Sequence, residues 1–275
     1  MTCRVLVVAS ALIVSIGAVT PTSAAPSPVT TKAVVVKIAG RSFAARLSYP
    51  TKGGPYPAIA FAHGYMNRSS WYAGTLRSIA AAGYVVIAPD SETGQFPSHA
   101  RLADDLNRSL QWLGLQSAIG SKDVPRRKVD SKHVGVAGHS MGGGVAPLAA
   151  ARSRTIDTVA TLAAAETTPR ASVAVRRLTV PSLFVVGSDD RIVPAAGTAV
   201  MFRRAPSPAL LATITGGSHC GFMETYPLAC DAGRISYDRQ VLLTREQLRR
   251  WFDKHLRAHK AARVTGVPGI RYVDD

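Results

Sequence analysis

The chain has 275 residues, of which 47% are hydrophobic and 18% are charged, a composition that supports a sizeable core and excludes a largely disordered protein. We find no Gly-X-Y or heptad period and no internal repeat, which excludes collagen-like, coiled-coil and solenoid folds. The formal net charge is +16, but the basic residues form only short scattered clusters, and no motif that reads a nucleic-acid groove accompanies them. We therefore expect no nucleic-acid partner and a solvated basic surface. Weak attraction to anionic envelopes or polymers is the alternative.

The first 25 residues have the features of a signal peptide. Arg4 precedes an apolar run from Val5 to Val19, and small residues follow up to Ala24 and Ala25. A basic start, an apolar middle and a small-residue exit predict cleavage after Ala24 or Ala25 and secretion to the extracellular space or periplasm. An uncleaved anchor is the alternative, although the run is short for a membrane span. We expect no stable membrane insertion after cleavage.

Strand and helix patterns alternate along the mature chain. Strands are predicted at Val34–Ile38, Ala44–Tyr49, Ala58–Ala62, Val85–Ala88, His133–Ala137, Val159–Ala163, Ser182–Val186 and Leu210–Ile214. Helices are predicted at Leu76–Ala82, Leu102–Leu115 and Gly142–Ala151, and a final one opens with Thr244-x-x-Gln247, a capping-box pattern. Short continuous apolar strands between helices are typical of an α/β fold with a mostly parallel central sheet and helices on both faces.

No linker interrupts this alternation, so we predict one α/β domain over residues 26–262 and an irregular C-terminal tail over residues 263–275. Only residues 164–181 separate the strand ending at Ala163 from the next strand. That interval is too short for a cap domain, and we expect an open cleft.

One motif carries candidate chemistry. Gly138-His139-Ser140-Met141-Gly142 matches G-x-S-x-G between a predicted strand and a predicted helix. Such a turn lifts the hydroxyl of Ser140 above the sheet edge at the start of the helix, which suits a nucleophile. The structural alternative is a glycine-rich turn without catalytic function.

A serine nucleophile needs a general base and an acid that orients this base. In this architecture the acid and then the base follow the serine along the chain. Two adjacent carboxylates, Asp189 and Asp190, compete for the role of the acid, and either could instead cap a helix or form a turn. His219 follows the last predicted strand and is the candidate base.

The oxyanion that develops during acyl transfer needs two N–H donors. The backbone N–H of Met141, which follows Ser140, is one candidate. The second is the backbone N–H of Tyr65 in the loop after the strand Ala58–Ala62. Simple packing is the alternative role for Tyr65.

Two cysteines, Cys220 and Cys230, remain after signal cleavage, because Cys3 leaves with the signal peptide. In an oxidising compartment two cysteines predict one disulfide. Two free buried thiols are the alternative.

These segments resemble the α/β-hydrolase superfamily. Within it they are most similar to the secreted bacterial polyester hydrolases, which are cutinase-like enzymes that cleave poly(ethylene terephthalate), and to their lipase, dienelactone-hydrolase-like and chlorophyllase-like relatives. The resemblance covers roughly residues 57–222 and rests on Gly64-Tyr65 with Ser69-Ser70, Gly83-Tyr84-Val85-Val86, Val129-Asp130 through Gly144, Val180-Pro181-Ser182-Leu183, Asp190 to Pro194 and Gly216-Gly217-Ser218-His219. It implies an α/β-hydrolase fold with Ser140, Asp190 and His219 as the catalytic triad, and its D-x-x-x-P arrangement favours Asp190 over Asp189.

The resemblance implies a carboxylic ester hydrolase that acts through an acyl-enzyme on lipid-like, bulky or polymeric esters, and we expect it to be secreted and monomeric. Two segments depart from the polyester hydrolases. Ala163-Ala164-Ala165-Glu166 stands where those enzymes carry a substrate-stacking tryptophan, and the segment from Cys220 to Cys230 is unlike theirs. Polyester is therefore not assumed as the natural substrate.

Other activities on this fold remain as alternatives. A serine nucleophile excludes a dehalogenase, which needs aspartate, and a dienelactone hydrolase proper, which needs cysteine. A serine peptidase, an acyltransferase and a catalytically silent binding module stay open. No cluster of metal ligands is evident in the sequence, so neither a metal nor a cofactor is expected.

Overall fold

The computed structural model describes residues 27–257 and 262–274, so the predicted signal peptide lies outside the described residues. The strands are β1 (Val29–Ile38), β2 (Arg41–Pro50), β3 (Tyr56–Ala62), β4 (Val85–Pro89), β5 (Val129–His139), β6 (Thr158–Leu162), β7 (Ser182–Gly187), β8 (Ala209–Ile214) and β9 (Ile270–Asp274). The helices are α1 (Ala73–Ala81), α2 (His99–Ile119), α3 (Met141–Ala150), α4 (Ala171–Ala174), α5 (Ala195–Phe202) and α6 (Tyr237–Leu256), with 3-10 turns η1 (Ser69–Tyr72), η2 (Val175–Arg177) and η3 (Cys220–Phe222).

All described strands form one sheet in the order β1-β2-β4-β3-β5-β6-β7-β8-β9. From β4 to β8 neighbouring strands are parallel, whereas β1, β2 and β9 join the two edges in antiparallel pairs. The hairpin between β1 and β2 turns at Gly40, where a φ of 73° favours glycine. The prediction of a mostly parallel central sheet is confirmed.

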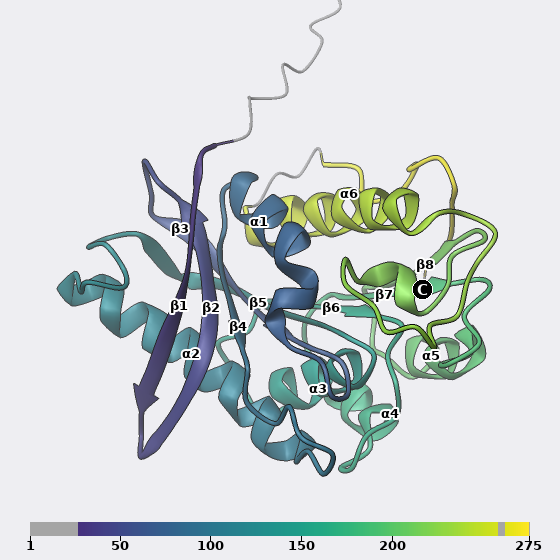
Figure 1. Cartoon of the computed structure of the whole chain (residues 1–275), viewed down its shortest axis with the longest axis horizontal. Coiled ribbons are helices and arrows are strands. Elements are labelled where there is room, and N and C mark those ends of the chain that lie inside the picture. The colour runs from purple at the N-terminus through teal and green to yellow at the C-terminus, as the bar shows by residue number, and fades with distance from the viewer. Residues whose placement is uncertain (1–26, 258–261, 275) are drawn as a thin grey trace, which may run out of the picture.

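Helices cover both faces of the sheet (Figure 1). On one face α2, α3 and α5 pack on the sheet, and the leucines of α2 at helical spacing point into this core. On the other face α1 and α6 pack, with Leu248, Trp251 and Phe252 of α6 buried. The connection from β6 to β7 holds only α4 and η2. Central strands such as β3 are buried on both sides, which explains their continuous apolar sequence.

Two predictions near the C-terminus were wrong. The last helix begins at Tyr237 rather than at Thr244, because the hydroxyl of Ser236 accepts the N–H of Arg239 and caps the helix there. Thr244 lies inside α6, and its hydroxyl donates to the carbonyl of Gln240. The tail over residues 263–275 was expected to be irregular, but its residues 270–274 form β9. This strand satisfies the backbone groups of β8, which would otherwise be an unpaired edge.

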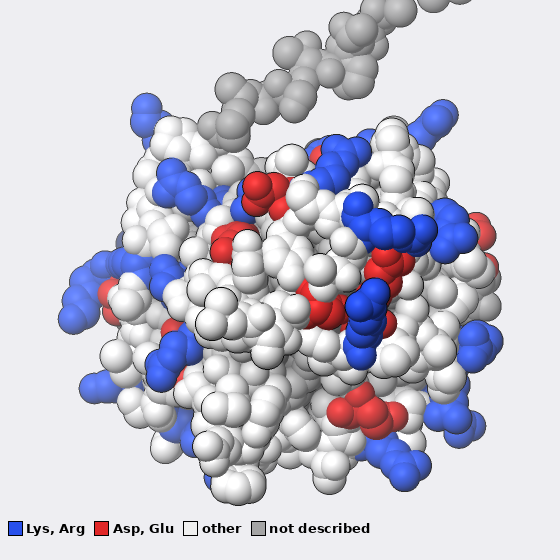
Figure 2. Space-filling view, turned by 45° about the vertical axis from the view of Figure 1, so that its right-hand side comes forward, with Lys and Arg blue, Asp and Glu red and all other residues white. Residues whose placement is uncertain are grey.

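The sequence predicts basic side chains that are scattered rather than gathered in one patch. Figure 2 shows lysine and arginine side chains dispersed over the visible face with acidic side chains between them, rather than gathered in one patch. Among the described residues, no helix has the length and apolar character needed to cross a membrane.

Candidate active site

Ser140 occupies the sharp turn between β5 and α3. Its backbone has φ 56° and ψ −119°, a conformation that a residue with a side chain rarely adopts and that is typical of strained functional turns. A Cβ on Gly138 would lie 2.3 Å from the carbonyl oxygen of Gly142, and one on Gly142 would lie 2.2 Å from that of Ala62. The turn therefore closes only with glycine at these two positions, which explains the spacing of the motif.

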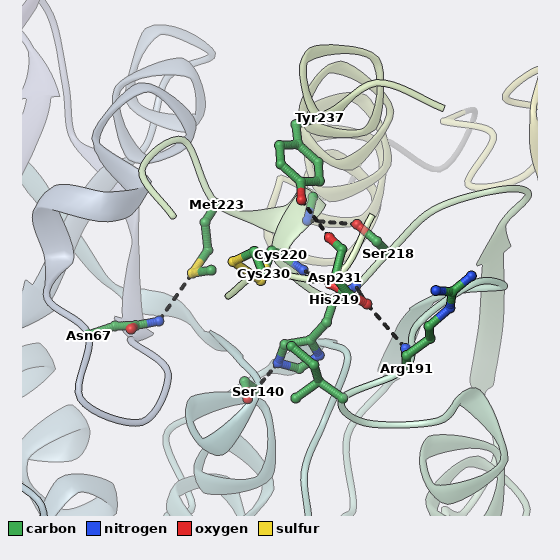
Figure 3. Close-up of a disulfide and its surroundings, with 12 residues drawn as sticks. Asn67, Ser140, Arg191, Ser218, His219, Cys220, Met223, Cys230, Asp231 and Tyr237 are labelled. Atoms are coloured by element: carbon green, nitrogen blue, oxygen red, sulfur yellow. Dashed lines mark hydrogen bonds between the residues drawn. A yellow bond between two sulfur atoms is a disulfide. The ribbon is translucent and has the colours of Figure 1, made fainter. Parts of the chain in front are cut away.

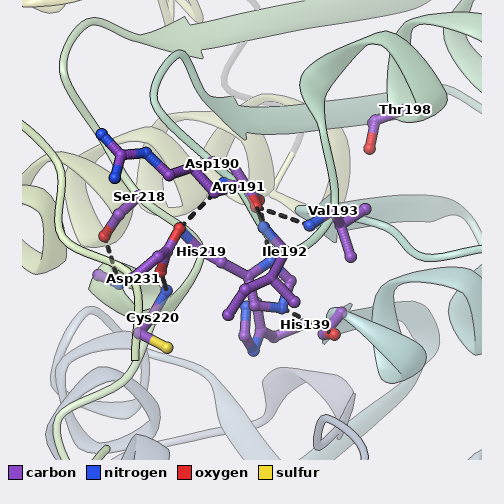
Figure 4. Close-up of polar contacts among 12 residues, drawn as sticks. His139, Asp190, Arg191, Ile192, Val193, Thr198, Ser218, His219, Cys220 and Asp231 are labelled. Carbon is purple, nitrogen blue, oxygen red and sulfur yellow. Dashed lines mark hydrogen bonds and ion pairs between the residues drawn. The ribbon is translucent and has the colours of Figure 1, made fainter. Parts of the chain in front are cut away.

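The structure brings the three predicted triad residues together. His219 Nε2 lies 2.9 Å from Ser140 Oγ, and His219 Nδ1 lies 2.8 Å from Asp190 Oδ2. Asp190 Oδ1 accepts the backbone N–H groups of Ile192 and Val193 at 3.0 and 2.7 Å, which fixes the carboxylate (Figure 4). His219 and Asp190 are only 4% and 8% exposed. A carboxylate at this position favours the tautomer with the proton on Nδ1, an arrangement in which Nε2 is free to accept a proton from the serine.

Asp189, the competing carboxylate, faces away from His219. It accepts the Ser188 hydroxyl and the guanidinium of Arg234 at 2.8 and 2.9 Å. The hydrogen bond from Arg234 is the main reason that the pKa of Asp189 is well below its usual value. The geometry favours Asp190 as the partner of the base.

Other histidines have different surroundings. His63 lies between the carbonyls of Gly64 and Ser91. His139 precedes Ser140, and its buried ring packs against the rings of His219 and Phe222, with centroids 4.7 and 5.6 Å away. Burial and the nearby His219 hold the pKa of His139 well below its usual value, so it is neutral.

The two candidate oxyanion donors lie beside Ser140. Met141 is the first residue of α3, so its N–H has no acceptor within the helix. A Cβ on Gly64, the residue before Tyr65, would lie 3.4 Å from Ser140 Cβ, which places this loop against the nucleophile. Within residues 27–257 and 262–274, neither the N–H of Tyr65 nor that of Met141 donates to another protein group.

Comparison with known proteins places the chain in a family. The sequence profile described as "PETase: PET hydrolase-like" matches residues 17–225. The chain belongs to the PET hydrolase-like family. It is 34% identical to cutinase est1 of Thermobifida alba over 149 residues, 54% of this chain and 47% of that protein. It is 35% identical to cutinase est2 of the same organism over 96 residues, 35% of this chain and 30% of that protein.

A plant relative matches over a similar extent. Chlorophyllase-1 of Arabidopsis thaliana is 30% identical over 121 residues, 43% of this chain and 36% of that protein. The chain thus spans less than half the length of each of these relatives. The α/β-hydrolase fold expected from the sequence is confirmed by the family and by the sheet.

This PET hydrolase-like chain also has a buried network that the sequence analysis missed. The hydroxyl of Tyr72 accepts the N–H of Gly64 at 3.1 Å and the amide of Asn67 at 3.2 Å. It lies 2.9 Å from His139 Nδ1. Because the oxygen of Tyr72 already accepts two hydrogen bonds, its own proton is the one available for this contact, and we assign Tyr72 as the donor. The network joins the loop of Tyr65 to the turn of Ser140. No sequence pattern marks Tyr72, because its partners come from separate segments.

The predicted disulfide is present. Cys220 and Cys230 are bonded, with their Cα atoms 5.8 Å apart, and Cys220 directly follows His219 (Figure 3). The bond joins η3 to the segment that leads into α6. It therefore attaches a second piece of chain to the loop of the candidate base.

We call the exposed apolar side chains of Tyr65, Met66 and Ile192, on the loops beside the triad, the rim of the site. Tyr65, Met66 and Ile192 have side chains about half exposed, at 51%, 49% and 51%. The hydroxyl of Tyr65 donates to the carbonyl of Gln95 rather than packing in the core. A cavity of about 440 Å³ lies beyond the acid loop, lined by Ala164, Glu166, Ser172, Val193, Pro194, Gly197, Val200, Met201 and Arg204. The stretch after β6 contributes alanine here and no aromatic ring. Among the described residues, no group of three or more metal-binding side chains converges.

Proposed function

We propose that the chain is a secreted serine carboxylic ester hydrolase that acts through an acyl-enzyme on lipid-like, bulky or polymeric esters. The continuous hydrogen-bonded series from Ser140 through His219 to Asp190 carries this proposal. Membership of the PET hydrolase-like family and the likeness to cutinases support ester hydrolysis. The disulfide between Cys220 and Cys230 supports an oxidising compartment.

The first half-reaction forms the acyl-enzyme. Ser140 Oγ bonds to the ester carbonyl carbon while its proton passes to His219 Nε2, and the carbonyl electron pair moves onto oxygen. The backbone N–H groups of Tyr65 and Met141 donate to this oxyanion. His219 then gives its proton to the alcohol oxygen as the carbon–oxygen bond breaks, and the alcohol leaves. Asp190 keeps the imidazole in the required tautomer and stabilises its charged form.

The second half-reaction releases the acid. A water molecule attacks the acyl carbon while His219 Nε2 takes its proton, and the same two N–H groups stabilise the second oxyanion. The tetrahedral intermediate collapses as His219 returns a proton to Ser140 Oγ, and the carboxylic acid leaves. Every proton transfer uses the same imidazole nitrogen, so one hydrogen-bonding geometry serves both halves.

The surroundings of the triad favour large substrates. The connection between β6 and β7 carries only short helical turns, so this connection forms no cap domain over Ser140. The half-exposed side chains of Tyr65, Met66 and Ile192 offer apolar contacts at the rim. An open apolar rim accommodates a bulky acyl or alcohol group with little need for a conformational change.

The test is the loss of the nucleophile. Ser140→Ala should remove nearly all hydrolysis of p-nitrophenyl esters, leaving an acceleration on the order of 10³-fold over water from binding and the oxyanion donors. A fluorophosphonate probe should label Ser140 alone, as read by peptide mass spectrometry. Ser131→Ala, an exposed serine at the start of β5, is the matched control and should keep full activity.

The outcomes separate the alternatives. Full activity in Ser140→Ala, or labelling at another serine, would overturn the assignment. Faster turnover of peptide than of ester chromogenic substrates would favour a peptidase. Acyl transfer to an alcohol in preference to water would favour an acyltransferase, and an absence of any turnover would favour a binding module.

A further inference from the structure

The acid and base of the triad lie on loops that follow different strands, and one carboxylate outside the triad contacts both. Asp231 Oδ2 accepts the backbone N–H of Arg191, the residue after the acid, at 3.1 Å. The same oxygen accepts the backbone N–H of His219 at 2.9 Å, and Oδ1 accepts that of Cys220 at 3.0 Å. Figures 3 and 4 show Asp231 between the two loops.

Covalent and polar contacts hold Asp231 in this place. Cys230 directly precedes it and is bonded to Cys220, one of the residues whose N–H it accepts. The hydroxyl of Tyr237, at the start of α6, donates to the backbone carbonyl of Asp231. Three residues on, Arg234 pairs with Asp189 in the acid loop. The segment 230–234 is therefore attached to the base loop at one end and to the acid loop at the other.

We propose that Asp231 is a positioning residue that sets the distance between Asp190 and His219, an inference that rests on the proposed ester hydrolysis. A catalytic hydrogen-bonded series must be held to about 0.5 Å, and loops tolerate more drift than strands. The bond between Asp190 and His219 joins two side chains, so it does not fix the two backbones. The N–H of Asp189 donates to the carbonyl of Gly217 at 2.8 Å, which joins the two loops one residue before the acid and two residues before the base. The side chain of Asp231 joins them again, at the base itself and at the residue after the acid.

The carboxylate chemistry is required for this role. Three N–H groups converge on two oxygens, and each hydrogen bond to an ionised acceptor is stronger than one to a neutral acceptor. An asparagine has one acceptor oxygen, and its NH₂ group would face an N–H donor. The disulfide then acquires a function beyond stability, because it keeps this carboxylate against the His219 loop.

The test is Asp231→Asn in the disulfide-bonded mature protein. Displacement of a reacting group by about 1 Å can cost on the order of 10²-fold in rate, so kcat on p-nitrophenyl butyrate should fall about 10- to 100-fold. KM should change less than about 2-fold, since Asp231 contacts backbone within the two loops and no rim side chain. Amide hydrogen exchange at Arg191, His219 and Cys220 should accelerate while exchange in β5 and β7 stays unchanged.

Asp238→Asn is the matched control. Asp238 is an exposed carboxylate in the first turn of α6, and its side chain makes no hydrogen bond to the described residues. The Asp238→Asn substitution removes the same charge from the same part of the chain. We therefore expect wild-type kcat and wild-type hydrogen exchange at the amides of Arg191, His219 and Cys220. A kcat loss of equal size in both variants would assign the effect to net charge and overturn the proposal.

The remaining outcomes are also decisive. Wild-type kcat in a folded Asp231→Asn protein would overturn the proposal. A rise in KM by the same factor as the fall in kcat would also overturn it. If that variant does not fold, amide hydrogen exchange in the wild type decides. The N–H of the exposed Arg191 should be protected only if Asp231 accepts its hydrogen bond, and rapid exchange at Arg191 would refute the contact. If the wild type neither hydrolyses esters nor labels at Ser140, the proposed function fails, and the exchange data still report on the loops.

Discussion

Tyr72→Phe removes one buried hydroxyl and leaves two buried groups without partners. Tyr72 is fully buried, and burial raises its pKa to about 12, so the hydroxyl keeps its proton and donates it to His139 Nδ1. Phenylalanine fills nearly the same volume and keeps the contact with the ring of Phe61, whose centroid lies 5.0 Å away. The lost interactions are therefore hydrogen bonds rather than packing. The N–H of Gly64 and Nδ1 of His139 become unsatisfied, whereas Asn67 retains the sulfur of Met223 at 3.1 Å.

Each unsatisfied buried group costs about 1–3 kcal/mol, so the free energy of unfolding should fall by about 2–6 kcal/mol. For a chain of this length each kcal/mol lowers the Tm by about 2–4 °C, so the Tm should fall by at least about 4 °C. Activity should fall about 10-fold, because Gly64 directly precedes Tyr65, the proposed oxyanion donor, and loses its fixed partner.

The assay combines calorimetry with ester hydrolysis at a temperature below both transitions. Tyr56→Phe is the matched control, since its hydroxyl donates to the carbonyl of Lys52 at the exposed surface, where water replaces the bond. That variant should change the Tm by less than about 2 °C. An unchanged Tm in Tyr72→Phe would refute the account of the buried network. A lower Tm with wild-type kcat would refute the link to the oxyanion loop.

Three further predictions concern the disulfide, access to the site and pH. Replacing Cys220 and Cys230 together by serine opens a loop with a sequence separation of 10, which should lower the free energy of unfolding by about 3 kcal/mol. Both the Tm and kcat should fall. Free thiols at these two positions in the native protein would contradict the premise. Without a cap, the rate should follow substrate concentration smoothly through the micellar threshold, and a sharp jump there would contradict an open site. Burial lowers the pKa of His255 to about 4, so its contribution to stability is present above about pH 6.5 and is lost as the pH falls toward 4. Urea unfolding at pH 7.5 and pH 5 should show this loss, and His255→Asn should reduce it.

Local patterns in the sequence determined the nucleophile turn and the places of most strands along the chain. The glycines around Ser140 are required by contacts within one turn and with the adjacent strand, so their spacing is visible in the sequence. The apolar strands are continuous because helices cover both faces, and this burial leaves a pattern in each strand by itself. The candidate base followed from its place after the last strand that the sequence predicts, and the disulfide from two cysteines in a chain with a predicted signal peptide.

The tertiary structure decided features that depend on residues far apart. The choice between Asp189 and Asp190 depends on which carboxylate meets His219 and which meets Arg234, and their adjacent positions give no local difference apart from the resemblance. The roles of Tyr72 and Asp231 arise from partners on separate segments, because a buried hydroxyl or carboxylate acts on whichever N–H groups the fold brings near it. The strand at residues 270–274 likewise exists because β8 offers unpaired backbone groups to it. Periodicity and spacing record the interactions of a residue with its neighbours along the chain, whereas these hydrogen bonds are set by the packing of the whole domain.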